Sequence, residues 1–160
     1  MKTIIVGVGN PILCDDGIGV LIANQISTIL DLEIHENVYI TEASVGGIRL
    51  MELLVGFEKA IIIDAIQSNN GNQPGKWYKM SLEDLRLSNP TQHSTSPHDT
   101  SLITALELGE RLGFQLPYEV TIYAIEVENI SDFGEVPTQA VENSIPEVIQ
   151  AIMQEIDMED

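Results

Sequence analysis

The chain has 160 residues, 44% of them hydrophobic, and its 25 Asp and Glu residues against 7 Lys and Arg residues give a formal net charge of -18. This length predicts one domain, residues 1–160, that buries a core without disulfides or a structural metal. The negative charge excludes nucleic acid and anionic lipid as partners and favours metal ions or basic peptides. Solubility by itself is the other explanation for this charge.

The first half of the chain alternates between predicted strands and helices. An apolar run predicts a strand over Thr3–Val8 that ends in a tight loop at Gly9. Asp15 and Asp16 follow, and they are able to cap a helix over about residues 16–30. The next expected elements are a strand at Val38–Thr41, a short helix at Gly47–Leu54 closed by Gly56, and a very apolar strand at Lys59–Ile66.

The second half continues the alternation. A strand at Lys76–Met80 is expected to lie at an edge and to run antiparallel to the strand before it. After it we expect an exposed loop at Ser88–Pro97 and then a helix that Asp99 begins and Gly113 ends. The apolar face of this helix consists of Leu102, Ile103, Leu106 and Leu112. The last expected elements are a strand at Val120–Val127 and a helical region from Val141 to Ile156 that Pro146 divides. Together these elements predict an α/β fold, a three-layer α/β/α sandwich around a mostly parallel twisted five-stranded sheet with one antiparallel edge strand.

Polar residues follow the predicted strands where a parallel sheet binds its ligands. Asp16 lies beyond the first strand, Asp64 near the end of the third, and His98 at the amino end of a later helix. Two carboxylates and an imidazole suit zinc or nickel and leave coordination positions open for water or substrate. Each residue also has a plain structural interpretation, as a helix cap, an acceptor for backbone amides or a loop residue.

Other catalytic patterns do not match. Gly7 and Gly9 follow a strand, but Ile12 occupies the third glycine position of a dinucleotide-binding loop, and Asp15 and Asp16 would repel a pyrophosphate. The sequence contains no G-x-S-x-G nucleophile elbow.

The remaining single residues are assigned structural roles. Cys14 has two acidic neighbours that disfavour a thiolate, so we interpret it as a small packed residue, and we interpret His35 and His93 as surface residues. Gly46-Gly47 predicts either a plain turn or a flexible rim beside a bound peptide.

The sequence also contains no secretory or membrane-spanning pattern. The start runs from Met1 directly into a strand, and apolar runs stay far shorter than the roughly 20 residues that cross a bilayer. Cys14 is the only cysteine, so no intrachain disulfide forms, and we expect a cytoplasmic protein.

Four sequence segments together resemble the hydrogenase maturation endopeptidases: GVGN at 7–10, DDGIG at 15–19, IDA at 63–65 and SPHD at 96–99. The resemblance implies an α/β/α fold and a nickel-dependent endopeptidase that removes the carboxy-terminal extension of a nickel-iron hydrogenase large-subunit precursor after nickel insertion. It also implies that Asp16, Asp64 and His98 contact nickel held by the substrate, that the free enzyme is metal-empty, and that Gly46 and Gly47 border the peptide. Many relatives have Gly-Gly-Thr where this chain has Ala-Ser-Val-Gly-Gly at 43–47, a difference that bears on substrate identity.

Two other functions remain open from the sequence. One is a non-catalytic metal- or peptide-binding chaperone on the same fold, and the other is a hydrolase of an unrelated protein. In each case the expected protein is a monomer that binds no nucleic acid and does not insert into a membrane.

Overall fold

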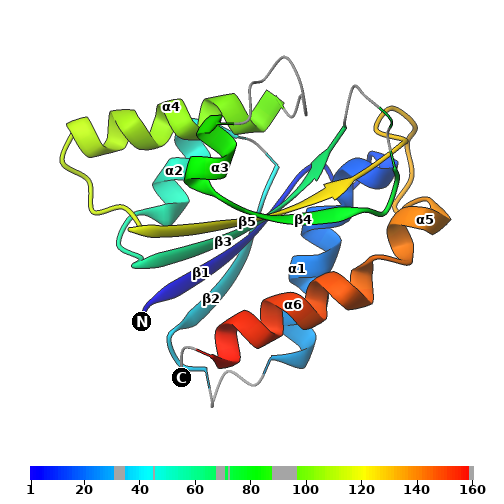
Figure 1. Cartoon of the computed structure of the whole chain (residues 1–160), viewed down its shortest axis with the longest axis horizontal. Coiled ribbons are helices and arrows are strands. Elements are labelled where there is room, and N and C mark those ends of the chain that lie inside the picture. Colours follow the sequence, from blue (N-terminus) through cyan, green and yellow to red (C-terminus); the bar gives the residue numbers. More distant parts are fainter. Residues whose placement is uncertain (31–34, 45, 68–70, 72, 88–96, 159–160) are drawn as a thin grey trace.

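The computed structural model describes residues 1–30, 35–44, 46–67, 71, 73–87 and 97–158, and the side chains of 97–101 lie outside that description. A twisted sheet lies between two groups of helices (Figure 1). This arrangement confirms the predicted α/β/α sandwich.

The sheet contains five strands within the described residues, in the order β2-β1-β3-β5-β4. Their bounds are β1 (Thr3–Val8), β2 (Val38–Ala43), β3 (Lys59–Ile66), β4 (Trp77–Ser81) and β5 (Glu119–Glu126). The four strands β2, β1, β3 and β5 are parallel, and β4 is antiparallel to β5. Every residue of β1 and β3 is buried, as expected for central parallel strands with helices on both faces.

One predicted strand neighbour is wrong. The strand now defined as β4 was expected to pair with β3, but it pairs with β5, where Tyr78 lies opposite Ala124. Seven of the eight residues of β5 are buried, so β5 takes the central position beside β3, whereas β4 has no buried residue and suits the edge. The antiparallel direction and the edge position of β4 are confirmed.

The helices cover the two faces of the sheet unequally. Their bounds are η1 (Cys14–Gly17, a 3-10 helix), α1 (Ile18–Ile29), α2 (Ile48–Leu54), α3 (Leu82–Leu87), α4 (Pro97–Arg111), α5 (Gln139–Glu142) and α6 (Ile145–Asp157). In Figure 1, α1 and α6 lie on one face and α2, α3 and α4 on the other. Alternate residues of β3 serve the two cores, because Ile62 packs with the α2 and α4 side and Ile63 with the α1 and α6 side. No helix in the described ranges has the length and apolar content needed to cross a bilayer.

Several boundary predictions are confirmed and one helix was missed. Gly113 ends α4 with a φ of 81°, and Pro146 lies in the first turn of α6, which separates it from α5. The missed helix, α3, follows reciprocal bonds between Ser81 and Asp84: the Ser81 N–H donates to Asp84 Oδ2 at 2.8 Å, and the Asp84 N–H donates to Ser81 Oγ at 3.1 Å.

Two side-chain predictions are wrong. Leu112 is 63% exposed, because it lies beyond the end of α4 rather than on its buried face. His35 is 9% exposed, with its Nε2 3.7 Å from an Asp157 carboxylate oxygen at the end of α6. The prediction for His93, and most of the predicted loop at 88–97, lies outside the described residues.

A buried ionic cluster fastens α6 to the sheet. Glu155 of α6 accepts bonds from Lys59 Nζ at 2.8 Å, Lys79 Nζ at 2.7 Å, Thr121 Oγ1 at 2.9 Å and Tyr123 OH at 2.6 Å. Burial raises the pKa of the Glu155 carboxyl, but these donors outweigh it and lower the pKa to about 2. Burial, with Glu155 as its partner, raises the pKa of Tyr123. Glu155 is therefore ionised in the folded protein.

Candidate active site at the carboxyl edge of the sheet

Asp16 is oriented by the turn that ends β1. The Asn10 N–H donates to Asp16 Oδ2 at 2.9 Å. Gly9 has a φ of 135°, and a Cβ there would collide with the carbonyl oxygen of Asp16, so this position requires glycine. Asp16 is half-buried, and within the described part of the chain its Oδ1 accepts no hydrogen bond. One carboxylate oxygen of Asp16 therefore has no donor from the described residues.

Asp64 lies on the neighbouring strand at the same edge. It is 2% exposed, and its Oδ1 accepts the N–H of Ala65 at 2.8 Å. Because Gly7 pairs with Ile63, Asp64 is level with Val8, the last residue of β1. The alternation along β3 directs the Asp64 side chain to the same face as Ile62, which is the face covered by α2 and α4.

Close backbone packing joins the two acidic segments. A Cβ at Gly19, in the first turn of α1, would collide with the carbonyl oxygens of Ile63 and Val8, so only glycine lets α1 approach the ends of β1 and β3. The η1 turn contacts β3 directly. Asp16 and Asp64 therefore lie in contacting elements at the carboxyl edge, where parallel sheets bind ligands.

His98 lies in the first turn of α4, and its side chain is outside the described residues. The chain leaves α4 to begin β5, so α4 runs back across the sheet and its first turn lies toward the carboxyl edge (Figure 1). Leu102, one turn later, belongs to the core cluster that includes Val8 at the end of β1. Among the described residues no three His, Cys, Asp or Glu side chains are grouped closely enough to hold a metal ion. The set of Asp16, Asp64 and His98 thus stays a prediction.

The glycine pair lies at the same edge. Gly46 and Gly47 connect β2 to α2, and the Gly9 N–H donates to the carbonyl of Ala43 at the end of β2 at 3.0 Å. Gly47 precedes α2 with a φ of 68° and a ψ of -134°, a conformation that favours glycine. A backbone role for Gly47 in the turn is therefore evident, and contact with a peptide stays a prediction.

The two adjacent acids do not cap the first helix as expected. The residue before α1 is Gly17, and no side chain accepts a capping hydrogen bond there. Asp15 instead is fully buried, and its carboxylate accepts the N–H groups of Glu128 at 3.2 Å, Asn129 at 3.0 Å and Thr138 at 2.6 Å. Asp15 thereby fastens the segment between β5 and α5 to the η1 turn.

Cys14 lies beside this contact, and its surroundings disfavour the thiolate, as its acidic neighbours predict. Burial, and next the charge of Asp15, raises the pKa of its thiol. Its Sγ donates to the carbonyl of Val136 at 3.5 Å, and its φ of 30° is unusual for a residue with a side chain. The thiol is half-buried and contributes to the same loop attachment as Asp15.

A buried acid that sequence reasoning missed ends β5. Glu126 is 4% exposed and lies on the same sheet face as Asp64, one strand away. It accepts the Tyr78 hydroxyl at 3.2 Å and the Gln73 N–H at 2.6 Å, so it holds the connection between β3 and β4. No local pattern distinguishes it from an ordinary strand-end glutamate, because its partners are distant in sequence.

Comparisons with known proteins identify the family. A model of the family HycI, hydrogenase maturation protease, matches residues 20–155, a range that contains Asp64 and His98 and begins just after Asp16. The chain is 28% identical over 155 residues to the hydrogenase 2 maturation protease of Escherichia coli strain K12. The aligned region covers 95% of this chain and 91% of that relative.

Two solved structures show the same fold. The hydrogenase maturating endopeptidase HybD from Escherichia coli matches with a TM-score of 0.80 and 24% identity, over 99% of this chain and 94% of that chain. The [NiFe] hydrogenase maturation protease HybD from Thermococcus kodakarensis matches with a TM-score of 0.70 and 24% identity, over 96% and 98%. With the family match over residues 20–155, these findings show that the chain is an enzyme of the hydrogenase maturation protease family.

Proposed function

We propose that this chain is the endopeptidase that removes the carboxy-terminal extension from a nickel-iron hydrogenase large-subunit precursor after nickel insertion. The observation that carries the proposal is the family match over residues 20–155, which includes the region of Asp64 and His98. The relative in Escherichia coli is named a maturation protease of hydrogenase 2, which supports a hydrogenase precursor as substrate.

In this proposal Asp16, Asp64 and His98 are the catalytic and metal-contacting residues, and the nickel arrives with the substrate. Carboxylate and imidazole ligands suit nickel, and Asp16 has one oxygen without a protein donor among the described residues. Because the nickel would come with the precursor, Asp16, Asp64 and His98 would bind a metal only when the precursor is loaded. Cleavage would therefore follow nickel insertion.

The carboxyl edge also supplies what peptide hydrolysis needs. A water polarised by the nickel, or deprotonated by one of the two carboxylates, would attack the peptide carbonyl beyond the ends of β1 and β3. Gly46 and Gly47, which lack side chains at this edge, would let the extended peptide lie against the backbone. We assign the reaction to the cytoplasm, in keeping with the single cysteine of the chain, and we expect the chain to act as a monomer.

The deciding experiment incubates the purified chain with nickel-loaded and nickel-free large-subunit precursor and measures the mass of the subunit's carboxy terminus. Loss of a short peptide from the loaded precursor alone is expected. Cleavage of both forms would contradict the nickel requirement, and cleavage of neither would contradict the protease assignment for this substrate.

A further inference from the structure

Large apolar side chains lie exposed beside the candidate site. Phe133 is 83% exposed and Val136 69% exposed, both on the segment between β5 and α5, and Ile12 is 51% exposed on the segment after β1. The Gly134 N–H donates to the carbonyl of Ile12 at 2.9 Å, which holds the two segments together. We refer to Ile12, Phe133 and Val136 as the apolar collar. Exposed apolar side chains on two adjoining backbone segments are typical of interaction sites.

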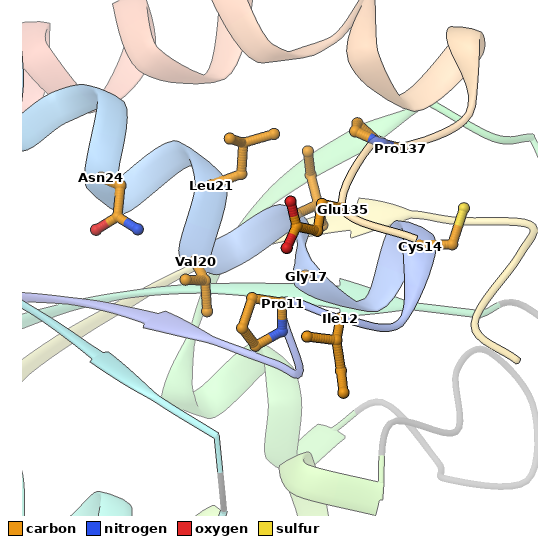
Figure 2. A pocket seen from close by; sticks show the side chains of 10 residues that line it. Pro11, Ile12, Cys14, Gly17, Val20, Leu21, Asn24, Glu135 and Pro137 are labelled. Carbon is orange, nitrogen blue, oxygen red and sulfur yellow. The ribbon is translucent and has the colours of Figure 1, made fainter. Parts of the chain in front are cut away.

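A cavity of about 330 Å³ is lined by Ile12 of the collar and by Glu135 and Pro137, the chain neighbours of Val136 (Figure 2). Its apolar walls are formed by Pro11, Ile12, Val20 and Leu21. Glu135 and Asn24 supply its polar groups, and Figure 2 shows both side chains. Gly17, directly after Asp16, also lines the cavity, so this cavity and the candidate site share the η1 turn.

The segments that line the cavity carry charged side chains of one sign only. No Lys or Arg occurs at 3–48 or at 112–160, and these ranges contain every residue that lines the cavity. Within the described residues the Glu135 carboxylate forms no ion pair or hydrogen bond, and the neighbouring Glu128 and Asp132 are exposed. A long apolar wall with an uncompensated carboxylate is complementary to a Lys or Arg side chain, whose aliphatic stem packs while its charged end pairs.

We propose that this cavity is a docking site for the precursor, in which Glu135 pairs with one Lys or Arg side chain and the apolar collar packs against the surrounding apolar surface of the precursor. The inference rests on the proposed function and adds the chemistry of the surface that the enzyme recognises. Docking beside η1 would hold the precursor across the carboxyl edge, independently of the nickel contact.

The test is the steady-state cleavage of the nickel-loaded precursor by two variants. Glu135→Gln, and Phe133→Ser combined with Val136→Ser, should each raise KM about tenfold or more while kcat changes less than about twofold. Added salt should raise KM for the unmodified chain and have a weaker effect on Glu135→Gln. Matched controls are Glu110→Gln and Leu112→Ser, which make the same kinds of change at exposed positions near the end of α4 and should leave KM unchanged.

An unchanged KM in both docking variants, with a fully active unmodified chain, would overturn the docking site and leave the protease function intact. An equal rise of KM in the controls would overturn it as well, because the effect would then come from general surface change. A collar variant that loses self-association in sedimentation while keeping its KM would instead identify the collar as a contact between two copies of this chain. Failure of the unmodified chain to cut the loaded precursor would contradict the function itself.

Discussion

Two adjacent acids in the η1 turn have opposite environments. Asp15 is fully buried and bonded to the segment before α5, whereas Asp16 is half-buried and keeps one oxygen free of donors among the described residues. Burial with several donors is typical of a structural carboxylate, and an accessible oxygen at the carboxyl edge is typical of a ligand or base.

Asp16→Asn should leave the precursor uncut while the protein folds normally. Asparagine keeps an oxygen that accepts the Asn10 N–H but removes the negative charge. The free energy of unfolding should therefore change by less than about 1 kcal/mol. The mass of the subunit's carboxy terminus measures cleavage. Asp157→Asn, which removes the same charge from the exposed end of α6, should cut normally. Normal processing by Asp16→Asn would remove Asp16 from the site, and the same criterion applies to His98→Ala.

Asp15→Ala should destabilise the fold by about 3 kcal/mol or more, because it leaves three backbone N–H groups near η1 without their charged acceptor. Urea unfolding measures the loss, with Asp16→Ala as the comparison, which should lose about 1 kcal/mol or less. Equal losses in the two variants would show that the structural distinction between these acids is incorrect.

At the scale of elements, the approach of α1 to the sheet depends on Gly19. In a helix interior Gly→Ala ordinarily stabilises by up to about 1 kcal/mol, but at Gly19 the new methyl group would meet the carbonyl oxygens of Ile63 and Val8. We therefore expect Gly19→Ala to destabilise by about 3 kcal/mol, with α1 pushed away from the edge.

The matched control for Gly19→Ala is Gly109→Ala in α4. A methyl group there would meet Leu116 Cδ1 at 2.9 Å and Met51 Sδ at 3.0 Å, the ends of flexible side chains that can shift. Its stability should change by less than about 1 kcal/mol in chemical unfolding. A stabilised Gly19→Ala protein would contradict the close contact between α1, β1 and β3.

The ionic cluster around Glu155 predicts how the attachment of α6 responds to acid. The folded-state pKa of about 2 lies below the ordinary value of 4.5, so the ionised carboxylate contributes stability above about pH 4.5 that is lost as the pH falls toward 2. The contribution is about 3 kcal/mol, and Glu155→Gln should be destabilised by a similar amount at pH 7, because the buried Lys59 then loses a charged partner. Unfolding free energy measured from pH 7 to 2 should therefore fall less in Glu155→Gln than in the unmodified chain. The control Glu110→Gln, at an exposed position, should show the same dependence of unfolding free energy on pH as the unmodified chain. If Glu155→Gln also showed the same dependence, the lowered pKa of Glu155 would be contradicted.

At the scale of the whole molecule, a net charge of -18 on 160 residues makes self-repulsion a general cost of folding. Salt at about 0.2 M screens exposed charges, so sodium chloride should raise the Tm of the unmodified chain at pH 7. The buried Glu155 cluster is screened less and should not reverse this trend. Differential scanning calorimetry at several salt concentrations checks the sign, and a falling Tm would show that surface ion pairs outweigh the repulsion.

Much of the fold could be predicted because its signals are local. The apolar runs of β1 and β3, the helical spacing in α1 and α6, and the chain breaks at Gly113 and Pro146 all lie within a few residues of the elements that they define. The strand ends also indicated which acids would lie at the carboxyl edge. The pairing of β4 with β5 and the burial of His35 could not be predicted, because both depend on competition between distant segments for one position.

The sequence by itself therefore determined the α/β class, the parallel alternation, the family motifs and the choice of Asp16, Asp64 and His98 as candidates. Only the tertiary structure separated Asp15 from Asp16, since the partners of Asp15 lie more than 110 residues away along the chain. Only the tertiary structure brought Ile12 and Glu135 to one cavity, and Lys59 and Glu155 to one ionic cluster. The physical reason is that hydrophobic periodicity is local, whereas a buried charge is stable only where the whole fold supplies its partners.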